Sequence, residues 1–415
     1  MNRKSFTLIE LLIVLSILAL IVGLLISIIK PAEIYKKTRD NQRIVDLNYL
    51  DSNIKSYLLL ANPSTIYTTS TLNKIFLSLK LPSSATNTDC RNYFPDLPSL
   101  PSGWTYVCSK NPTSTDGTGW LPINFQNYML YSISNLPLDP LNNSIYYYAF
   151  IASGTDFILY TMLEDPKNQA SKNDGDNYPH LYSAGTNKRL IDQAQGLVGY
   201  WPFDEGTGTI AYDYSGNGNN GILYSSTTIC SNPPTSGCPT WTTGKVGGAL
   251  SFDGVDDYVN ISSSNLNTSS LRYILRGGAS SSPFTIVLWK NSQAPVTNNY
   301  WIGRVGWTNG IDLDCRFILF DASNNAYSTT FSCTHNNWEF IVASWDKSVM
   351  KFYFNGNKVG ERSFSGILRD NNYPIQIGGQ TGVTWYFARG IIDEVRIYNR
   401  ALSDSEIKAL YDATK

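Results

Sequence analysis

The stretch "KSFTLIELLIVLSILALIVGLLISIIKP" (residues 4–31) decides how the N-terminal part of this chain is built. From Phe6 to Ile29 it runs for 24 residues, almost all apolar, with a single carboxylate, Glu10. As a helix rising about 1.5 Å per residue it reaches roughly 36 Å, enough to cross a hydrocarbon core of about 30 Å. A charged side chain inside such a segment is costly and usually marks a function. The stretch therefore predicts a membrane helix in which Glu10 has a specific role.

The helical pattern continues beyond this segment, unlike that of a secretory signal peptide. Lys30-Pro31 follows, where a signal peptide has a small-residue cleavage site. We expect one long helix that ends at Asn62-Pro63, with a membrane-embedded first half, an amphipathic second half and a kink at Pro31. The apolar residues of the second half recur at spacings of three and four: Ile44, Leu47, Leu50, Ile54, Tyr57 and Leu58.

The composition excludes several classes of function. The 415 residues allow two or more domains, and 16% charged with 13% aromatic residues is not a disordered composition. The 32 Lys and Arg residues against 33 Asp and Glu leave no basic field for nucleic acid. His180 and His335 are the 2 histidines, so His-based catalysis and zinc ligation have little to work with.

The 6 cysteines fall into close pairs, without the Cys-x-x-Cys spacing of zinc or thioredoxin-like sites. Beside a membrane-targeting segment such pairs indicate disulfides in an oxidising compartment, with free buried thiols as the alternative. Disulfides place the C-terminal bulk of the chain outside the cytoplasm. The pairs are Cys90 with Cys108, Cys230 with Cys238, and Cys315 with Cys333.

The last pair also has a predicted geometry. "CRFILF" and "STTFSC" flank "DASNNAY" and are typical of two antiparallel strands. A register that pairs Phe317 with Phe331 sets Cys315 directly opposite Cys333, where a cross-strand disulfide fits.

The N-terminal stretch "KSFTLIELLIVLSILALIVGLL" resembles the class III signal of type IV prepilins and type II secretion pseudopilins. The resemblance implies that a prepilin peptidase cuts between Ser5 and Phe6 and methylates the new amino group of Phe6. The family usually has glycine before the cut, where this chain has Ser5. The resemblance also implies that Glu10 pairs with the N-terminal amine of a neighbouring subunit and is an assembly residue. A plain anchor whose acid reaches the headgroups is the alternative.

Residues 64–195 have the pattern of a compact α+β head. "TLNKIFLSLKLP" (71–82) predicts a short helix. "SIYYYAFIASGTDFILYTMLED" (144–165) predicts a β-hairpin and loosely resembles the pilin hairpin. In "NDGDN", Asp174 and Asp176 are either calcium ligands, as in some pseudopilin loops, or part of a solvated polar loop.

From Gly196 onward the chain changes to short β-rich runs with Gly-Asn turns, and eight of the 10 tryptophans lie here. "MKFYFNG" alternates aromatic residues and ends in Asn355-Gly356, a strong hairpin signal. Strands without intervening helices predict an antiparallel sandwich. Ser403 and Glu406 form a predicted capping box for a last helix.

Four phrases in this part resemble the laminin-G-like, concanavalin-A-like jelly roll across about residues 196–412: "GYWPFDEGTGTIAYDYSGNGNNG", "GKVGGALSFDGVDDYV", "WEFIVASWDKSVMKFYFNGNKVG" and "IIDEVRIYNRALSDSEI". The family implies ligand binding, often of carbohydrate, and frequently a structural calcium ion. It also includes glycosidases, whose strands carry closely spaced acids. In this chain the glutamates of the domain are scattered, so we expect that it is not an enzyme. These glutamates are Glu205, Glu339, Glu361, Glu394 and Glu406.

A calcium site is predicted where the first and last strands of this domain meet. If "LVGYWPF" pairs antiparallel with "IDEVRIY", Asp204 at the end of one strand meets Asp393 at the start of the other. Asp213 would add a third hard oxygen ligand suited to Ca²⁺. Ordinary turn-forming aspartates are the alternative.

Sugar binding needs exposed aromatic faces. Trp289 lies inside a β-patterned run and is expected in the core. The predicted stacking platforms lie in Gly- and Asn-rich surroundings: Trp301, Trp307, Trp385 and Tyr386.

These patterns predict an α+β pilin-like domain with a long N-terminal hydrophobic helix, followed by an all-β concanavalin-A-like jelly-roll sandwich. The predicted parts are a leader peptide, a transmembrane and assembly segment, a pilin-like head and a laminin-G-like domain: residues 1–5, 6–29, 30–195 and 196–415.

The predicted function is that of a minor or tip pilin-like subunit that displays a ligand-binding domain for adhesion. It would sit in the cytoplasmic membrane with its C-terminal domains outside, and in a surface filament after processing. Its partners would be other pilin subunits, the prepilin peptidase, the membrane, and a glycan or protein. A pseudopilin whose jelly roll contacts exported cargo is the alternative, and a jelly-roll glycosidase a more distant one.

Overall fold

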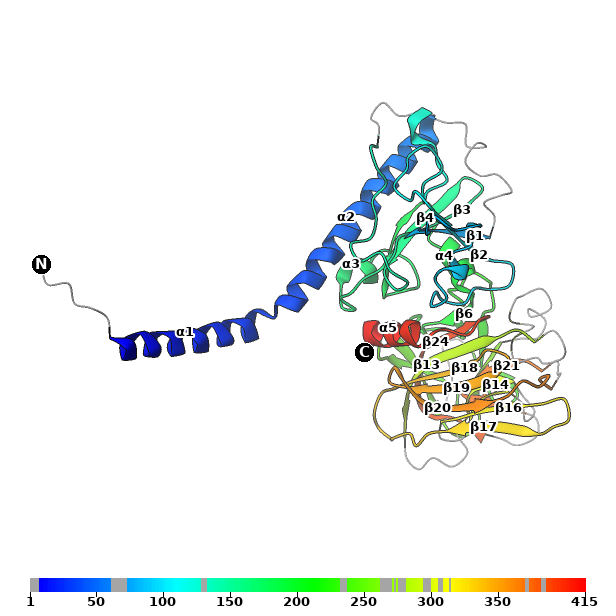
Figure 1. The fold of residues 1–415 in the computed structure, drawn as a ribbon. Coiled ribbons are helices and arrows are strands. Elements are labelled where there is room, and N and C mark those ends of the chain that lie inside the picture. Colours follow the sequence, from blue (N-terminus) through cyan, green and yellow to red (C-terminus); the bar gives the residue numbers. More distant parts are fainter. Residues whose placement is uncertain are drawn as a thin grey trace, which may run out of the picture.

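The computed structural model shows a pair of N-terminal helices, an α/β head and a β-sandwich (Figure 1). The described residues are 7–60, 73–127, 133–231, 237–261, 271, 274, 281–293, 300–304, 309–312, 315–369, 373–381 and 386–415, and side chains are described for all of these except 23–29.

The N-terminal helices α1 (Leu8–Ile29) and α2 (Pro31–Leu60) meet at Lys30, whose φ is 44°. Pro31 takes the first position of α2, where its missing N–H has no helical partner to lose. The chain changes direction here, so the predicted kink is confirmed (Figure 1). The second half of α2 packs on the head through predicted positions of its apolar face: Leu47, Leu50, Ile54 and Tyr57.

The head is built on a five-stranded sheet in the order β2-β1-β3-β4-β5. Its β3–β4 pair closes with Ser153 opposite Asp156, which confirms the predicted hairpin. The strands are β1 (Lys74–Lys80), β2 (Thr105–Ser109), β3 (Ala149–Ser153), β4 (Asp156–Met162) and β5 (Leu181–Gly185). The short helices are η3 (Cys90–Asn92), η4 (Phe125–Asn127), α3 (Gln169–Lys172) and α4 (Leu190–Gln195).

The helix predicted for residues 71–82 is wrong, because residues 74–80 form strand β1. Alternate side chains of β1 enter two different cores. Phe76 packs with α2, whereas Ile75 and Leu77 pack on the opposite face of the sheet. Burial on both faces removes the polar alternation that marks a strand in sequence.

The C-terminal region is a sandwich of two sheets, as predicted. The eight-stranded sheet has the order β10-β11-β24-β13-β18-β19-β20, with β6 beside β24. Its strands are β6 (Leu197–Trp201), β10 (Thr240–Thr243), β11 (Gly248–Asp253), β13 (Phe284–Ser292), β18 (Glu339–Trp345), β19 (Val349–Phe354), β20 (Asn357–Ser363) and β24 (Arg389–Tyr398).

The second sheet has nine strands in the order β17-β16-β15-β14-β21-β12-β8-β7, with β9 beside β8. Leu288, Trp345 and Ile377 are among the apolar side chains that fill the space between the two sheets. The strands are β7 (Ile210–Ala211), β8 (Gly221–Ser225), β9 (Thr228–Ile229), β12 (Asp257–Ile261), β14 (Tyr300–Arg304), β15 (Gly310–Asp312), β16 (Arg316–Phe320), β17 (Ala326–Thr330) and β21 (Ile375–Ile377). A small separate pair is formed by β22 (Gly379–Gln380) and β23 (Tyr386–Phe387).

The outer face of the eight-stranded sheet is covered by the head and by the last helix, α5 (Asp404–Thr414) (Figure 1). The predicted capping box of Ser403 and Glu406 begins α5. We call this outer face the covered face. It shares one apolar core with the head and is formed by Val287, Trp289, Phe340, Val342, Tyr353 and Tyr398.

Polar contacts at the covered face join the same parts. Arg400 donates to the carbonyl of Gln195 at 2.6 Å and to its side-chain Oε1 at 2.7 Å, and it forms a 2.7 Å ion pair with Glu406. The main chain turns at Gly196, with a φ of 73°, and a Cβ there would clash with Asn399 Oδ1. The head and the sandwich are therefore joined by a common core and by buried charge, in addition to the covalent link.

The three predicted disulfides, Cys90–Cys108, Cys230–Cys238 and Cys315–Cys333, are all present. The register predicted for the last pair is wrong by two residues, because Phe317 lies opposite Thr329. Asp321 closes the turn earlier than predicted: its side chain accepts hydrogen bonds from the N–H groups of Ser323 and Asn325. The bond thus links Cys315 to a residue beyond the end of β17.

Candidate functional site

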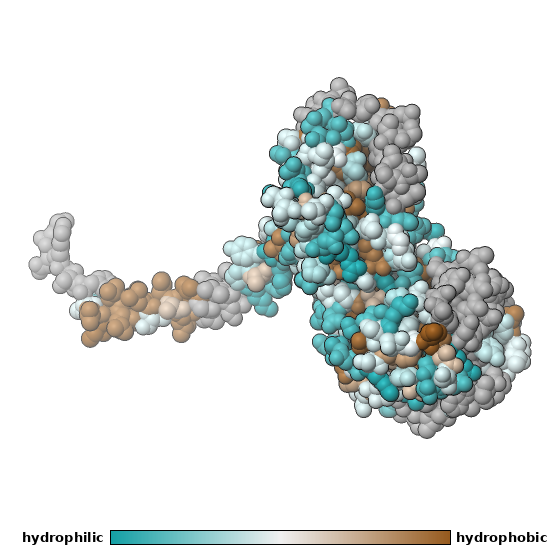
Figure 2. Space-filling view, turned by 45° about the vertical axis from the view of Figure 1, so that its right-hand side comes forward, coloured by the Kyte–Doolittle hydropathy of each residue, from teal (hydrophilic) through white to brown (hydrophobic). Residues whose placement is uncertain are grey.

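Helix α1 carries the predicted assembly residue, Glu10. The apolar side chains of residues 8–22 are exposed and form the brown part of the projecting helix in Figure 2. Thr7 donates to Glu10 Oε2 from its N–H and from its hydroxyl, both at 2.9 Å, so Glu10 closes the first turn of α1. The Thr-x-x-Glu spacing is a capping-box signal that the sequence analysis missed. Ser5 and Phe6 lie outside the described residues.

Across the part of the chain with described side chains, no helix is both long and apolar enough to cross a membrane.

A buried ion cluster holds α2 to the head. The guanidinium of Arg43 donates to both oxygens of Asp139, at 2.7 and 3.0 Å, and to Asp40 and Glu164 at 2.8 and 2.7 Å. Asp40 also accepts the N–H groups of Glu164 and Asp165. Breaking a pair of this kind leaves an uncompensated buried charge, so the cluster fixes the helix to the head. The cluster was not predicted, although Asp40 and Arg43 stand three residues apart directly before the apolar positions that begin at Ile44.

The predicted calcium ligands lie at one corner of the sandwich, and the predicted pairing of β6 with β24 is confirmed. Asp393 is fully buried; its Oδ2 accepts the N–H groups of Lys245 and Val246 at 2.8 and 2.9 Å, and its Oδ1 has no partner. Burial, together with the charges of Glu394 and Asp204, raises the pKa of Asp393 to about 8. Asp204 is exposed and accepts the N–H of Gly248 at 2.5 Å.

The predicted third ligand, Asp213, does not join this corner. Its oxygens accept the N–H groups of Tyr200, Ser215 and Asn219 at 2.8 to 3.0 Å, so they are used to close its own loop. Within the described residues the carboxylates of the predicted trio do not converge to within 4.8 Å. The trio is therefore wrong as predicted, and a pair, Asp204 and Asp393, remains.

The predicted stacking platforms have different outcomes. Trp301 is fully buried between the two sheets, with the ammonium of Lys290 at 4.9 Å from its ring, so its prediction as a platform is wrong. A β-bulge between Tyr300 and Ile302 accompanies this inward position. Tyr386 is half-buried on β23. Trp307 and Trp385 lie outside the described residues.

The outer face of the nine-stranded sheet carries aromatic rings beside amides. Tyr224 and Tyr258 lie directly opposite each other on β8 and β12, with stacked rings 5.2 Å apart. Next to them, the amide of Gln376 donates to Asn260 Oδ1 at 3.4 Å and to the hydroxyl of Thr381 at 3.0 Å. These five residues form what we call the aromatic–amide face. Aromatic rings offer flat apolar surfaces, and planar amides can both donate and accept hydrogen bonds.

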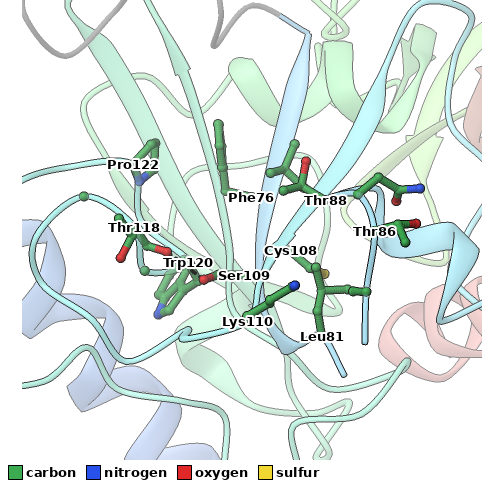
Figure 3. Close-up of a pocket in the computed structure, with 15 residues that line it drawn as sticks. Phe76, Leu81, Thr86, Thr88, Cys108, Ser109, Lys110, Thr118, Trp120 and Pro122 are labelled. Carbon is green, nitrogen blue, oxygen red and sulfur yellow. Dashed lines mark hydrogen bonds between the residues drawn. The ribbon is translucent and has the colours of Figure 1, made fainter. Parts of the chain in front are cut away.

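A separate pocket of about 350 Å³ lies in the head (Figure 3). Phe76 and Trp120 line it, with the hydroxyls of Thr86, Thr88 and Thr118 around them. The hydroxyl of Thr118 is already bonded to Asp116 at 2.6 Å. The residues that line this pocket all belong to the head. No pattern in the sequence predicted the pocket.

Two family models match the chain. Residues 1–26 match the prokaryotic N-terminal methylation motif, and residues 253–408 match the concanavalin A-like lectin/glucanases superfamily. The chain thus carries a match to an N-terminal methylation motif and, further along, a match to a concanavalin A-like domain. No curated protein matches the chain.

Several solved structures are similar to about half of this chain. Domain 4 of the GH43 extracellular arabinanase AbnA from Geobacillus stearothermophilus is 19% identical over 52% of this chain and 98% of that chain, with a TM-score of 0.37. The binding domain of Paraclostridial Mosquitocidal Protein 1 is 20% identical over 52% of each chain, with a TM-score of 0.38. The ligand binding domain of Botulinum neurotoxin serotype D is 15% identical over 52% and 51%, with a TM-score of 0.37. The match thus spans about half the length of the two toxin domains.

Proposed function

We propose that this protein is a pilin-like subunit, anchored in the membrane by its N-terminal helix, that presents a lectin-like sandwich for adhesion to glycans. The observation that carries the proposal is a continuous physical connection between the two ends of the molecule. Helix α2 packs on one face of the head sheet, and the other face of that sheet shares a core with the sandwich. A binding domain held in this way keeps a set position relative to the filament helix.

For assembly, we propose cleavage between Ser5 and Phe6 and pairing of Glu10 with the amine of a neighbouring Phe6. A charge in a membrane-embedded helix is stabilised when a partner of opposite sign lies beside it. Glu10→Ala should abolish incorporation into filaments, whereas Glu33→Ala, an exposed acid on α2, should not. Mass spectrometry that finds Met1 intact on surface protein, or normal incorporation of the Glu10 variant, contradicts this part.

We propose a minor or tip position rather than the main shaft. Packed filament helices lie about 8–10 Å apart, and a jelly roll of about 220 residues has a diameter of roughly 40 Å or more. The link between head and sandwich is one residue, Gly196, between α4 and β6, so it offers no reach for the sandwich to avoid its neighbours. Immunogold label against residues 196–415 should be sparse or terminal, and dense regular label along the shaft contradicts it.

We propose that glycans bind at the aromatic–amide face. The half-buried ring of Tyr224 and the neighbouring amides support this, since the covered face is occupied by the head and α5. Tyr224→Ala should lose most binding on a glycan array. The matched control is Tyr212→Ala, an exposed tyrosine of the same sandwich that lies outside this face. Equal binding by the two variants contradicts the assignment.

Binding rather than catalysis is supported by the partners of the sandwich glutamates. Glu339, Glu394 and Glu406 form ion pairs with Lys290, Arg396 and Arg400 at 2.6 to 2.7 Å. Each of these acids is engaged by a cationic side chain of the fold, and the paired Arg400 lowers the pKa of Glu406 against the effect of its burial.

For calcium, we propose the pair Asp204 and Asp393. The unpartnered Oδ1 of the buried Asp393 fits a hard cation, which would add charge stabilisation at this corner. Calcium should then raise the unfolding midpoint of the wild type and leave that of Asp393→Asn unchanged. A wild-type midpoint that is the same with calcium and with chelator contradicts the site.

A further inference from the structure

A cavity of about 340 Å³ lies where the head, the sandwich and α5 meet. The head contributes Lys172 and Asn177, the first and last strands of the sandwich contribute Tyr200, Glu394 and Arg396, and α5 contributes Thr414. We call it the junction cavity. Its volume is that of a small-molecule site, and sites of this kind are common where two domains meet.

The floor of the junction cavity is a linked set of buried polar groups. The hydroxyl of Tyr200 donates to Glu394 Oε1 at 2.8 Å, and Glu394 Oε2 lies 2.6 Å from the guanidinium of Arg396. The guanidinium stacks on Tyr200, 4.1 Å from the ring centre. These side chains belong to residues that are 8%, 2% and 1% exposed. Buried charges that are positioned by their neighbours in this way form a preorganised site rather than a solvated surface.

Two buried polar atoms in this region have no hydrogen-bond partner within the protein. Arg396 Nε is buried and has no hydrogen-bond partner, and the same is true of Asp176 Oδ2 on the head side. Glu394 also has a φ of 56°, a conformation that is strained for a residue with a side chain. Strained backbone of this kind clusters at ligand-binding sites, and unpaired buried polar groups are rare in folded proteins.

The charges around the junction cavity are of both signs. Arg396, Lys172, Lys245 and Lys415 are cationic donors and Glu394 is an anionic acceptor, whereas burial and the charge of Asp174 raise the pKa of Asp176, so that its carboxyl can donate as well as accept. A strongly anionic or cationic ligand would meet repulsion from one of these sets. A hydroxyl group both donates and accepts, so a ring that carries several hydroxyls can satisfy both sets.

We propose that the junction cavity binds one uncharged sugar residue of a glycan, as a site distinct from the aromatic–amide face. The proposal rests on the glycan-binding function proposed above and assigns it a second site. Because the walls come from the head and from the sandwich, a bound sugar stabilises their docking. Ligands that bind only the folded state raise its stability by mass action.

The test uses the full chain purified in detergent and saturation-transfer NMR with free hexoses and N-acetylhexosamines. Val246→Trp fills the mouth of the cavity from a residue that is 37% exposed, and Val255→Trp, at a turn residue that is 68% exposed, is the matched control. With Tyr224→Ala as background, to remove the other site, we expect sugar signals in the control and their loss in Val246→Trp.

A second variant keeps the proposal testable if Val246→Trp does not fold. Lys172→Ala removes an exposed cationic donor of the lining and leaves the buried pair of Glu394 and Arg396 intact. It should weaken sugar binding by roughly tenfold, the value of a charged hydrogen bond. Undiminished sugar binding by Val246→Trp or by Lys172→Ala overturns the junction cavity and leaves the proposed function standing. If the wild type binds no glycan on the array and no free sugar, both proposals are wrong.

Discussion

The two outer faces of the sandwich differ in what their strands present. On the covered face, Val287 and Trp289 of β13 and Phe340 of β18 are at most 2% exposed beneath α5 and the head. On the aromatic–amide face, Tyr224 and Asn260 remain half-buried at the surface. The architecture of the two sheets is alike, so the difference lies in the outward side chains. The covered face is part of the subunit's core, whereas the aromatic–amide face keeps Tyr224 and Asn260 partly exposed beside the buried Tyr258 and Gln376.

The largest expected effect comes from emptying the covered face. Trp289 stacks on Tyr411, packs at a tilt against Phe340, and donates from Nε1 to the hydroxyl of Thr414 at 3.0 Å. Trp289→Ala should lower the free energy of unfolding by about 3–5 kcal/mol, because it leaves a cavity in a shared core. Urea unfolding measures this. Tyr224→Ala, on the other face, should cost only about 1 kcal/mol, and equal costs would remove the distinction between the faces.

The next effect is a dependence of the folding stability on pH, caused by a buried histidine, His180. His180 is 8% exposed, and its Nδ1 has no hydrogen-bond partner. Burial, and the charges of Arg396 and Arg400 against that of Glu406, lower the pKa of His180 to about 4 from 6.5. Between these values the unfolded chain binds the extra proton, so stability is full above pH 6.5 and falls as the pH drops toward 4. The loss is on the order of 3 kcal/mol.

The control for this effect is His180→Gln, which removes the titrating group. The wild type should lose stability relative to this variant as the pH falls from 6.5 to 4. Asp192, whose burial raises its pKa to about 7, acts in the opposite direction in both proteins and cancels in the comparison. Parallel stability curves for the two proteins would contradict the buried neutral histidine.

A smaller effect is expected at the start of α5. The hydroxyl of Ser403 accepts the N–H of Glu406, and the carboxylate of Glu406 accepts the N–H of Ser403. Ser403→Ala should cost about 1 kcal/mol through the lost cap. Ser405→Ala, in the first turn of the same helix, is the control in a chemical unfolding titration. A cost near zero for Ser403→Ala would mean that packing alone holds α5 in place.

Local signals predicted the parts of the fold that depend on near neighbours. The capping box, the disulfide pairs and the β3–β4 hairpin were all predicted, because each is encoded within about twenty residues. Strand β1 was missed because its two faces enter different cores. Trp301 was misplaced because its Gly- and Asn-rich surroundings gave no sign of its inward position.

The shared core had a signal that was not used. "IVLW" (286–289) and "FIVA" (340–343) are unbroken apolar runs, whereas a sandwich strand with one solvated face alternates. Their outward residues Val287 and Val342 are indeed buried against the head side. The partner of that face lies far away in sequence, so only the three-dimensional structure identifies it. The same holds for the junction cavity and for the ion cluster around Arg43.

The head and the sandwich form one body through the covered face. Differential scanning calorimetry of the full chain in detergent can test this, because a common core couples the unfolding of both parts. We expect a single transition that contains the head and the sandwich, and in Trp289→Ala this whole transition moves to lower temperature. Two independent transitions, with only the sandwich shifted by Trp289→Ala, would contradict it.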